Sequence, residues 1–213
     1  MPYGYLGQNQ PNQTVSNSGV FSITDVAELQ SQGKLGGSLE LIEEQTASTT
    51  SSVDFTSIKE SKYDVHKVEW NDLTIGTSAA NYLQLRFSNN GGTSYISSGY
   101  QVAMQYGGNN GSFGGLRSTS TSSITYLSYS ATTTSNANQN GYLYLYNLGN
   151  SSKYSFLTNQ SFSQSTSSNA FFYFGGGVLP TAETHNAFQL LLSGGATITG
   201  TIKLYGVKQI WVT

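Results

Sequence analysis

The 213-residue chain contains no cysteine and few charged residues. Without cysteine it can form neither disulfides, thiolate nucleophiles nor cysteine-ligated metal sites. Only 9% of its residues are charged, against about 25% in ordinary soluble domains, and the net charge is −2. Phosphate-backbone binding depends on clustered lysines and arginines, and the chain has no such cluster. The composition therefore predicts that nucleic acid is not a partner.

Long apolar runs are also missing. A membrane-spanning helix needs about 18 consecutive apolar residues, and no stretch of the chain approaches this length. The first ten residues lack the basic and apolar regions of a secretory signal peptide. We therefore expect no membrane partner, and synthesis in a cytoplasm without export by a signal peptide.

The residues that are abundant indicate an all-β protein. Aromatic residues make up 13% of the chain, which distinguishes it from a disordered, polar sequence. Short runs with strand character alternate with turns such as Asn89–Gly92 and Gly107–Gly111. Regular short strands with glycine-rich turns predict a single β-sandwich of jelly-roll type over residues 38–213. Within it, we expect the aromatic run Phe171–Phe174 to form a buried strand, followed by glycines that let the chain leave it.

The first and last strands of this sandwich are expected to pair. Residues Thr197–Val212 mix β-branched, aromatic and polar residues, as a half-buried strand does, and Ser38–Gln45 alternates in the same way. We predict antiparallel pairing of the two strands, with Lys203 beside Glu40 or Glu43.

Residues 1–37 are predicted to form an N-terminal anchoring arm with one short helix. The arm is rich in glycine, glutamine, asparagine and serine, and its helix is too short to be stable alone in water. It must therefore dock, either on its own sandwich or on a neighbouring subunit. The apolar residues available as assembly anchors are Val20, Phe21, Ile23, Val26 and Leu29.

Catalytic and metal-binding patterns are weak. The chain has two histidines, His66 and His185, and the pair Glu183-x-His185 lacks a third metal ligand nearby. Serines are numerous, but no G-x-S-x-G elbow occurs, and Gly175–Gly177 lacks the Lys-Ser/Thr of a phosphate loop. We predict no enzyme activity, no cofactor and no metal.

Tyrosines beside glycine- and asparagine-rich loops are the candidate binding residues. Tyrosine with asparagine, serine and glycine is a recurrent composition of binding loops, and aromatic faces stack on sugar rings. Capping of the sandwich edges is the alternative role for these rings. The candidate receptor or glycan contacts are Tyr95, Tyr100, Tyr106 and Tyr126.

Three segments resemble virion structural proteins of tailed, particularly marine, bacteriophages. They are Gly19–Val26 (GVFSI-x-DV), Arg86–Gly92 (RFSNNGG) and Gly200–Val207 (GTIKLYGV). The resemblance implies a jelly-roll-like β domain and a place on the virion. It carries no catalytic signature, and no site residue follows from it.

The sequence therefore suggests a non-enzymatic phage structural protein, either a tail fibre or a tail-attached appendage that can bind the host surface. A capsid decoration or head-fibre protein and a lectin-like glycan-binding module are the alternatives. A polysaccharide-degrading enzyme ranks last, because it would need two acidic residues facing one cleft. The expected partners are other virion proteins, a host-surface glycan and further copies of the chain. A homotrimer is favoured by the resemblance to phage fibres.

Overall fold

The computed structural model describes residues 23–31, 38–76, 81–130, 138–164 and 169–208. The chain separates into two compact units, residues 1–38 and 39–213, which are considered individually. The sequence predicts the boundary one residue earlier, between residues 37 and 38.

The first unit contains helix α1 (Ile23–Ser31). Two of the predicted anchor residues, Ile23 and Val26, are exposed on this helix. Leu29 lies in the helix, but its side chain is outside the described part of the structure, as are Val20 and Phe21. A nine-residue helix with exposed apolar side chains is marginal on its own. The anchoring role of the five residues stays a prediction.

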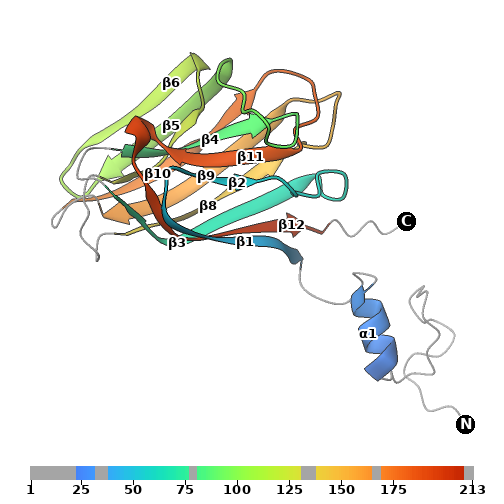
Figure 1. Cartoon of the computed structure of the whole chain (residues 1–213). Coiled ribbons are helices and arrows are strands. Elements are labelled where there is room, and N and C mark those ends of the chain that lie inside the picture. Colours follow the sequence, from blue (N-terminus) through green and yellow to red (C-terminus); the bar gives the residue numbers. More distant parts are fainter. Residues whose placement is uncertain (1–22, 32–37, 77–80, 131–137, 165–168, 209–213) are drawn as a thin grey trace, which may run out of the picture. The chain divides into compact units, whose positions relative to one another are not determined.

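The second unit is a sandwich of two antiparallel sheets (Figure 1). The larger sheet contains, in spatial order, β1 (Leu39–Thr50), β12 (Ile198–Val207), β3 (Val65–Ile75), β8 (Gln139–Tyr146), β9 (Ser155–Gln164), β10 (Ala170–Leu179), β5 (Tyr100–Gly108) and β6 (Phe113–Thr121). The smaller sheet contains β2 (Ser52–Phe55), β11 (Ala187–Leu192), β4 (Asn81–Ser88) and β7 (Ile124–Ser130). A short 3-10 turn, η1 (Ser193–Gly195), links β11 to β12. The predicted all-β sandwich is confirmed, whereas its jelly-roll type stays a prediction.

Pairing of the first and last strands is confirmed, with a corrected register. β1 and β12 are antiparallel neighbours, and a bulge between Leu41 and Glu43 shifts their register. Because of this extra residue, Lys203 lies opposite Glu44, and their charged groups are 3.2 Å apart. The prediction that Lys203 lies beside Glu40 or Glu43 is therefore wrong. Glu40 instead binds Lys62 at 3.0 Å.

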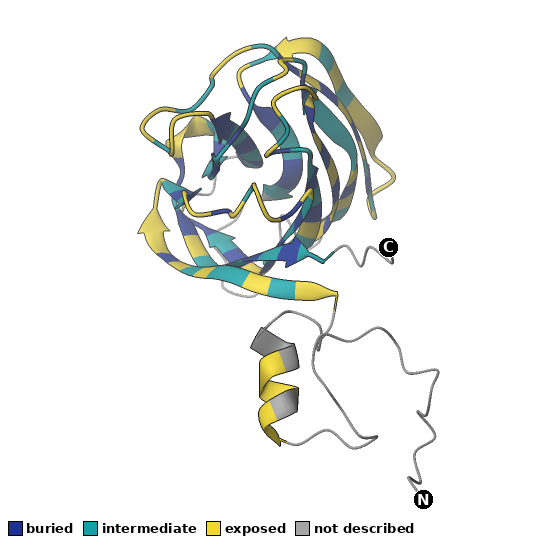
Figure 2. Ribbon diagram, turned by 90° about the vertical axis from the view of Figure 1, so that its right-hand side faces the viewer, coloured by how far each residue is buried: buried dark blue, intermediate teal, exposed yellow. Residues whose placement is uncertain are grey.

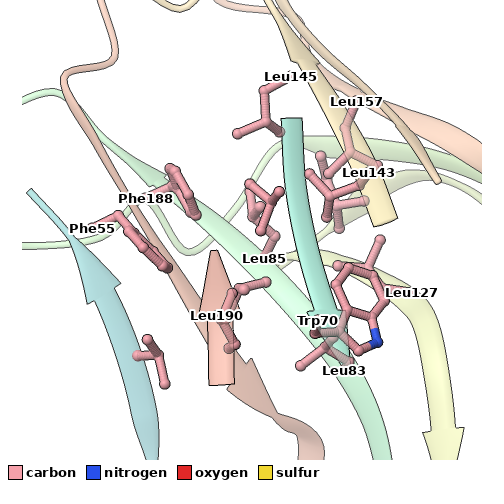
Figure 3. Packing of buried hydrophobic residues seen from close by; sticks show 14 of the residues in the cluster. Phe55, Trp70, Leu83, Leu85, Leu127, Leu143, Leu145, Leu157, Phe188 and Leu190 are labelled. Atoms are coloured by element: carbon pink, nitrogen blue, oxygen red, sulfur yellow. The ribbon is translucent and has the colours of Figure 1, made fainter. Parts of the chain in front are cut away.

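The hydrophobic core lies between the sheets, where the buried residues in Figure 2 face one another. Both sheets contribute large side chains (Figure 3). Phe55 and Phe188 of the smaller sheet stack with ring centroids 4.9 Å apart. Trp70 and Leu143 of the larger sheet are equally buried. These packed layers hold the outer surfaces of both sheets in fixed positions.

Candidate functional site: an aromatic face on the larger sheet

Strand β9 has its apolar and polar sides reversed relative to an ordinary sandwich strand. Two of its outward residues, Phe156 and Phe162, are exposed aromatic rings. The side chains that point to the interior are mostly small and polar: Ser155, Leu157, Asn159, Ser161 and Ser163. Since successive residues of a strand point to opposite faces, a slip by one residue would bury the phenylalanines and expose the serines. The orientation of β9 is therefore set by something other than hydrophobicity.

Hydrogen bonds across the core set this orientation. The amide Nδ2 of Asn159 and the hydroxyl of Ser161 both donate to the carbonyl of Leu127 in β7, at 2.9 and 2.6 Å. Buried polar groups are costly unless they are hydrogen-bonded, so these two bonds favour the observed orientation over its inverse. The consequence is that the phenylalanine rings of β9 face solvent.

The neighbouring strands add further rings to the same surface, which we call the outer aromatic face. Its members are Phe113, Tyr142, Phe156, Phe162, Phe172 and Phe174, all exposed. The other exposed large apolar side chains of the described sandwich are Leu39 and Leu41 on β1, in the same sheet, and Tyr154, which precedes β9. Exposed apolar surface is thus concentrated on the larger sheet.

A glycine lets two of these rings lie close to the sheet. Gly107 on β5 lies between Phe113 on β6 and Phe172 on β10 in the register. A Cβ atom at Gly107 would come within 2.6 Å of the Phe172 ring and 2.7 Å of the Phe113 ring. Any larger residue would therefore displace one of the rings, so this glycine is part of the surface.

The rings border a groove of about 520 Å³ over β8, β9 and β10. Its lining residues are Asn140, Gly141, Tyr142, Gln160, Ser161, Phe162, Phe172, Tyr173 and Phe174. Phe172 and Phe174 are stacked, with centroids 5.9 Å apart. The Tyr142 hydroxyl donates to Oε1 of Gln160 at 2.7 Å. The groove thus combines aromatic faces with amide and phenol groups and has no charged residue in its lining.

The charged groups of β3 and β12, on one side of the groove, are paired. Lys67 on β3 contacts Glu69 at 2.6 Å, and the Tyr205 hydroxyl donates to Glu69 at 2.8 Å. The Lys67 ammonium is 5.8 Å from the Tyr142 ring. Because Lys67 is neutralised by Glu69, it does not give the groove a strong positive potential.

Two of the tyrosines predicted as receptor contacts differ in burial: Tyr100 is part of the packing, whereas the contact role of Tyr95 stays a prediction. Tyr100 is 0% exposed; its oxygen accepts from the Phe87 amide at 2.7 Å, and its hydroxyl donates to the Ile96 carbonyl at 3.1 Å. Burial raises the pKa of Tyr100 to about 12. Tyr95 is half-buried, and burial together with the Asp54 carboxylate raises its pKa to about 12. Tyr100 therefore presents no ring face to a ligand.

The other two predicted contacts, Tyr106 and Tyr126, are brought together in a cluster of tyrosines. Their ring centroids are 6.5 Å apart. The cluster also contains Tyr82, Tyr129 and Tyr173. Tyr82 and Tyr126 are stacked, with centroids 4.0 Å apart, and burial raises the pKa of Tyr82. The rings stabilise one another between strands β4, β5, β7 and β10.

The pair Glu183-x-His185 belongs to a hydrogen-bonded series whose serine and histidine are buried and whose carboxylate is partly exposed. The Ser155 hydroxyl is 2.7 Å from Nδ1 of His185, and Nε2 of His185 is 3.2 Å from a Glu183 carboxylate oxygen. The order serine, histidine, carboxylate is that of a hydrolase triad. However, Ser155 and His185 are both 0% exposed, so a substrate cannot reach the hydroxyl. The series links β9 to the segment before β11 and is structural.

Acid is expected to destabilise the protein through its two histidines. Burial lowers the pKa of both His66 and His185 from the ordinary value of 6.5, and the Glu183 carboxylate only partly offsets this at His185. The unfolded chain therefore binds protons below pH 6.5 that the folded chain does not bind until the pH is lower. The free energy of unfolding should fall as the pH drops from about 6.5 to about 5, above the carboxylate range. Urea titrations at several pH values measure this.

The histidine pair provides the control for that titration. A double variant, His66→Asn with His185→Asn, should be less stable at neutral pH but should lose most of the pH dependence in this window. A wild-type urea midpoint that stays constant between about pH 7 and 5 would contradict the buried, neutral state of both rings.

The residues of the outer aromatic face were missed by the sequence interpretation. Phe171–Phe174 was expected to be a buried strand, but only Tyr173 is buried and Phe172 and Phe174 are exposed. The signal that could have found them is the alternation of β9, where serine and asparagine occupy one side and phenylalanine, threonine and glutamine the other. This alternation shows that the two sides of β9 differ in character, but it does not by itself show which side is buried.

Among the described residues, no group of three or more histidine, aspartate or glutamate side chains is placed to hold a metal ion. No helix in the described part of the chain has the length and apolar character needed to cross a membrane. No known protein family, no curated protein and no solved structure matches the chain.

Proposed function

We propose that the chain is a non-enzymatic structural protein of a bacteriophage virion, a tail fibre or tail-attached appendage. In this proposal residues 1–37 anchor it to the particle, and the sandwich presents the outer aromatic face to the host surface. The observation that supports a binding role is the reversed strand β9, whose exposed phenylalanines are held outward by buried hydrogen bonds.

The energetic cost of this arrangement is what makes it informative. Full burial of a phenylalanine side chain stabilises a protein by about 1.5–3 kcal/mol relative to leaving it exposed. The outer aromatic face forgoes that stabilisation at several rings, among them Phe162 at 58% and Phe113 at 76% exposure. Contiguous exposed apolar surface of this kind marks an interaction site. Its place on rigid strands makes the geometry of that site fixed in advance.

Two features of the sandwich favour binding over catalysis. The one serine within hydrogen-bonding distance of a histidine among the described residues, Ser155, is inaccessible. The groove has no carboxylate in its lining, whereas glycoside hydrolysis needs two. A reactive fluorophosphonate should therefore leave Ser155 unlabelled, as mass spectrometry of the treated protein would show.

A capsid decoration or head-fibre protein is the alternative location and would use the same anchor and the same binding face. We also propose that the chain forms a homo-oligomer, with a trimer favoured. Leu39 and Leu41 on the edge strand β1 offer apolar contacts for another copy, and β12 and β3 separate them from the groove strands β8, β9 and β10. Light scattering of the purified protein gives its mass, and a monomer at high concentration would contradict this part of the proposal.

Deletion of residues 1–37 is expected to leave the sandwich folded and to abolish incorporation into virions. The sandwich has its own core, so its melting temperature should change by less than about 3 °C. Incorporation should be lost because the apolar anchors, including Phe21, are removed. The measurements are a thermal melt of the truncated protein and its copy number in purified particles.

A matched variant separates anchoring from receptor binding. Phe21→Ser in the full-length chain should reproduce much of the loss of incorporation, whereas Phe162→Ser on the sandwich should be incorporated normally. If the truncated protein unfolds, residues 1–37 belong to the core of the sandwich. If it is incorporated at normal copy number, the anchor lies elsewhere.

A further inference from the structure

We propose that the groove bordered by Tyr142, Phe162, Phe172 and Phe174 is a binding site for an uncharged saccharide unit. The inference deepens the proposed function and depends on it, since it names the chemistry of the surface that the sandwich would recognise. It rests on the ring faces, the polar groups and the lack of charge in the groove.

The ring faces suit the apolar side of a pyranose. A sugar ring presents a patch of C–H bonds that packs on an aromatic face, which carries the negative side of its quadrupole. Phe162 and Phe172 are direct cross-strand partners, and Phe174 lies two residues from Phe172 on the same strand. The three rings therefore lie close together on two adjacent strands, and the strand pairing fixes their positions before a ligand arrives.

The polar groups suit the hydroxyls of the same sugar. Because Oε1 of Gln160 accepts from the Tyr142 hydroxyl, the Nε2 group of Gln160 keeps both its N–H donors, and within the described residues it has no partner. Oδ1 of Asn140 accepts from the Asp72 amide at 2.9 Å, so its Nδ2 group is likewise a donor with no partner in the described structure. The Tyr142 oxygen keeps lone pairs to accept a bond. Donors and an acceptor beside stacked rings are the complement of a polyhydroxylated ring.

The charge and the size of the groove restrict the kinds of ligand that fit it. No acidic or basic side chain lines it, and Lys67, whose ammonium is 5.8 Å from the Tyr142 ring, is bound to Glu69 at 2.6 Å. A sialylated or phosphorylated glycan would lack a counter-charge there, so a neutral one is favoured. The volume of about 520 Å³ lies in the range of about 300–1,000 Å³ typical of ligand pockets.

A second copy of the chain is the competing occupant of this face. The amide donors of Gln160 and Asn140 argue against it, because a dry protein interface would bury them without acceptors, at about 1–3 kcal/mol each. A saccharide supplies an acceptor for each donor with its own hydroxyls. The groove therefore favours a small polar ligand over a flat protein surface.

The test is calorimetric titration of the full-length protein with neutral disaccharides built from glucose, galactose, mannose and N-acetylglucosamine, with sialyllactose as the charged comparison. At least one neutral disaccharide should bind, and sialyllactose should not. Phe174→Ala and Gln160→Ala should each weaken that binding at least about tenfold. Phe156→Ala is the matched control: this ring is exposed on the same face but does not line the groove, so its loss should change the affinity less than about twofold. A thermal melt confirms that each variant is folded.

Three outcomes would overturn the inference. They are no binding of any neutral disaccharide at about 10 mM, tighter binding of sialyllactose, and equal weakening by Phe156→Ala and Phe174→Ala. If Phe174→Ala instead converts an oligomer to a monomer in light scattering and no sugar binds, the face is an interface between copies. None of these results changes the outcome expected for incorporation into virions. The saccharide proposal and the virion proposal can therefore fail independently of one another.

Discussion

A Leu204→Asp protein is expected not to fold. Leu204 lies in the middle of β12 and is 0% exposed, with β1 on one side and β3 on the other. An ionised carboxylate at this position would be buried without a cation, and a protonated one would still lack partners for its oxygens. Either cost is comparable to the whole stability of a domain, about 5–15 kcal/mol. Loss of soluble protein, or of cooperative unfolding by circular dichroism, is the expected observation.

Two further variants, one at Leu204 and one at the neighbouring Lys203, are the controls. Leu204→Val removes one methylene group and should cost about 0.5–1.5 kcal/mol, so the protein stays folded. Lys203→Asp introduces the same negative charge one residue earlier. The native Lys203 side chain is partly exposed to solvent and pairs with Glu44, so the substituted carboxylate would not be buried. It should cost only about 1 kcal/mol or less. A cooperatively folded Leu204→Asp protein would mean that β12 does not line the core.

The double variant Asn159→Ala with Ser161→Ala is expected to lose about 2–4 kcal/mol of unfolding free energy. Both side chains donate to the Leu127 carbonyl, so their joint removal leaves a buried acceptor without these partners, at about 1–3 kcal/mol beyond the bonds themselves. Urea denaturation gives the difference. The variant also removes the buried Asn159 Oδ1, which has no hydrogen-bond partner among the described residues, and this offsets part of the loss.

The opposite face of the same strand provides the contrast. The double variant Phe156→Ser with Phe162→Ser removes far more side-chain atoms, yet it should cost only about 1–2 kcal/mol, less than the inward pair, because roughly half of each ring is already exposed. If this pair were the more destabilising one, β9 would face the other way in solution, and the outer aromatic face would be part of the core.

The comparison of these two strands explains how much of the fold could be predicted. In β12 the apolar side chains Ile202 and Leu204 alternate with threonine and lysine, so one face is plainly the buried one, and its pairing with β1 was predicted correctly. In β9 a side with serines and an asparagine alternates with a side that carries phenylalanines, and hydrophobicity favours the wrong side. Its orientation depends on a carbonyl in another sheet, at Leu127, which no local pattern reveals.

The candidate site was hidden for a related reason. Tyr100 and Tyr106 both border glycine-rich turns, yet both fall on the inward side of β5, where Tyr100 has two backbone partners and is fully buried. Proximity to a turn says little about the face on which a ring lies. The register shift between Leu41 and Glu43 is equally invisible in the sequence, and it moved the partner of Lys203 by one residue.

The two ends of the larger sheet differ in how they are protected. β1 at one end carries Glu40, Glu43 and Glu44, whereas β6 at the other end has a single charged residue, Arg117. In the described part of the chain no strand pairs with the outer edge of β6, so its free amide and carbonyl groups can template another strand. Concentrated salt screens the lone guanidinium and removes the repulsion between two such edges. The protein should therefore aggregate edge to edge through β6, most readily at high ionic strength.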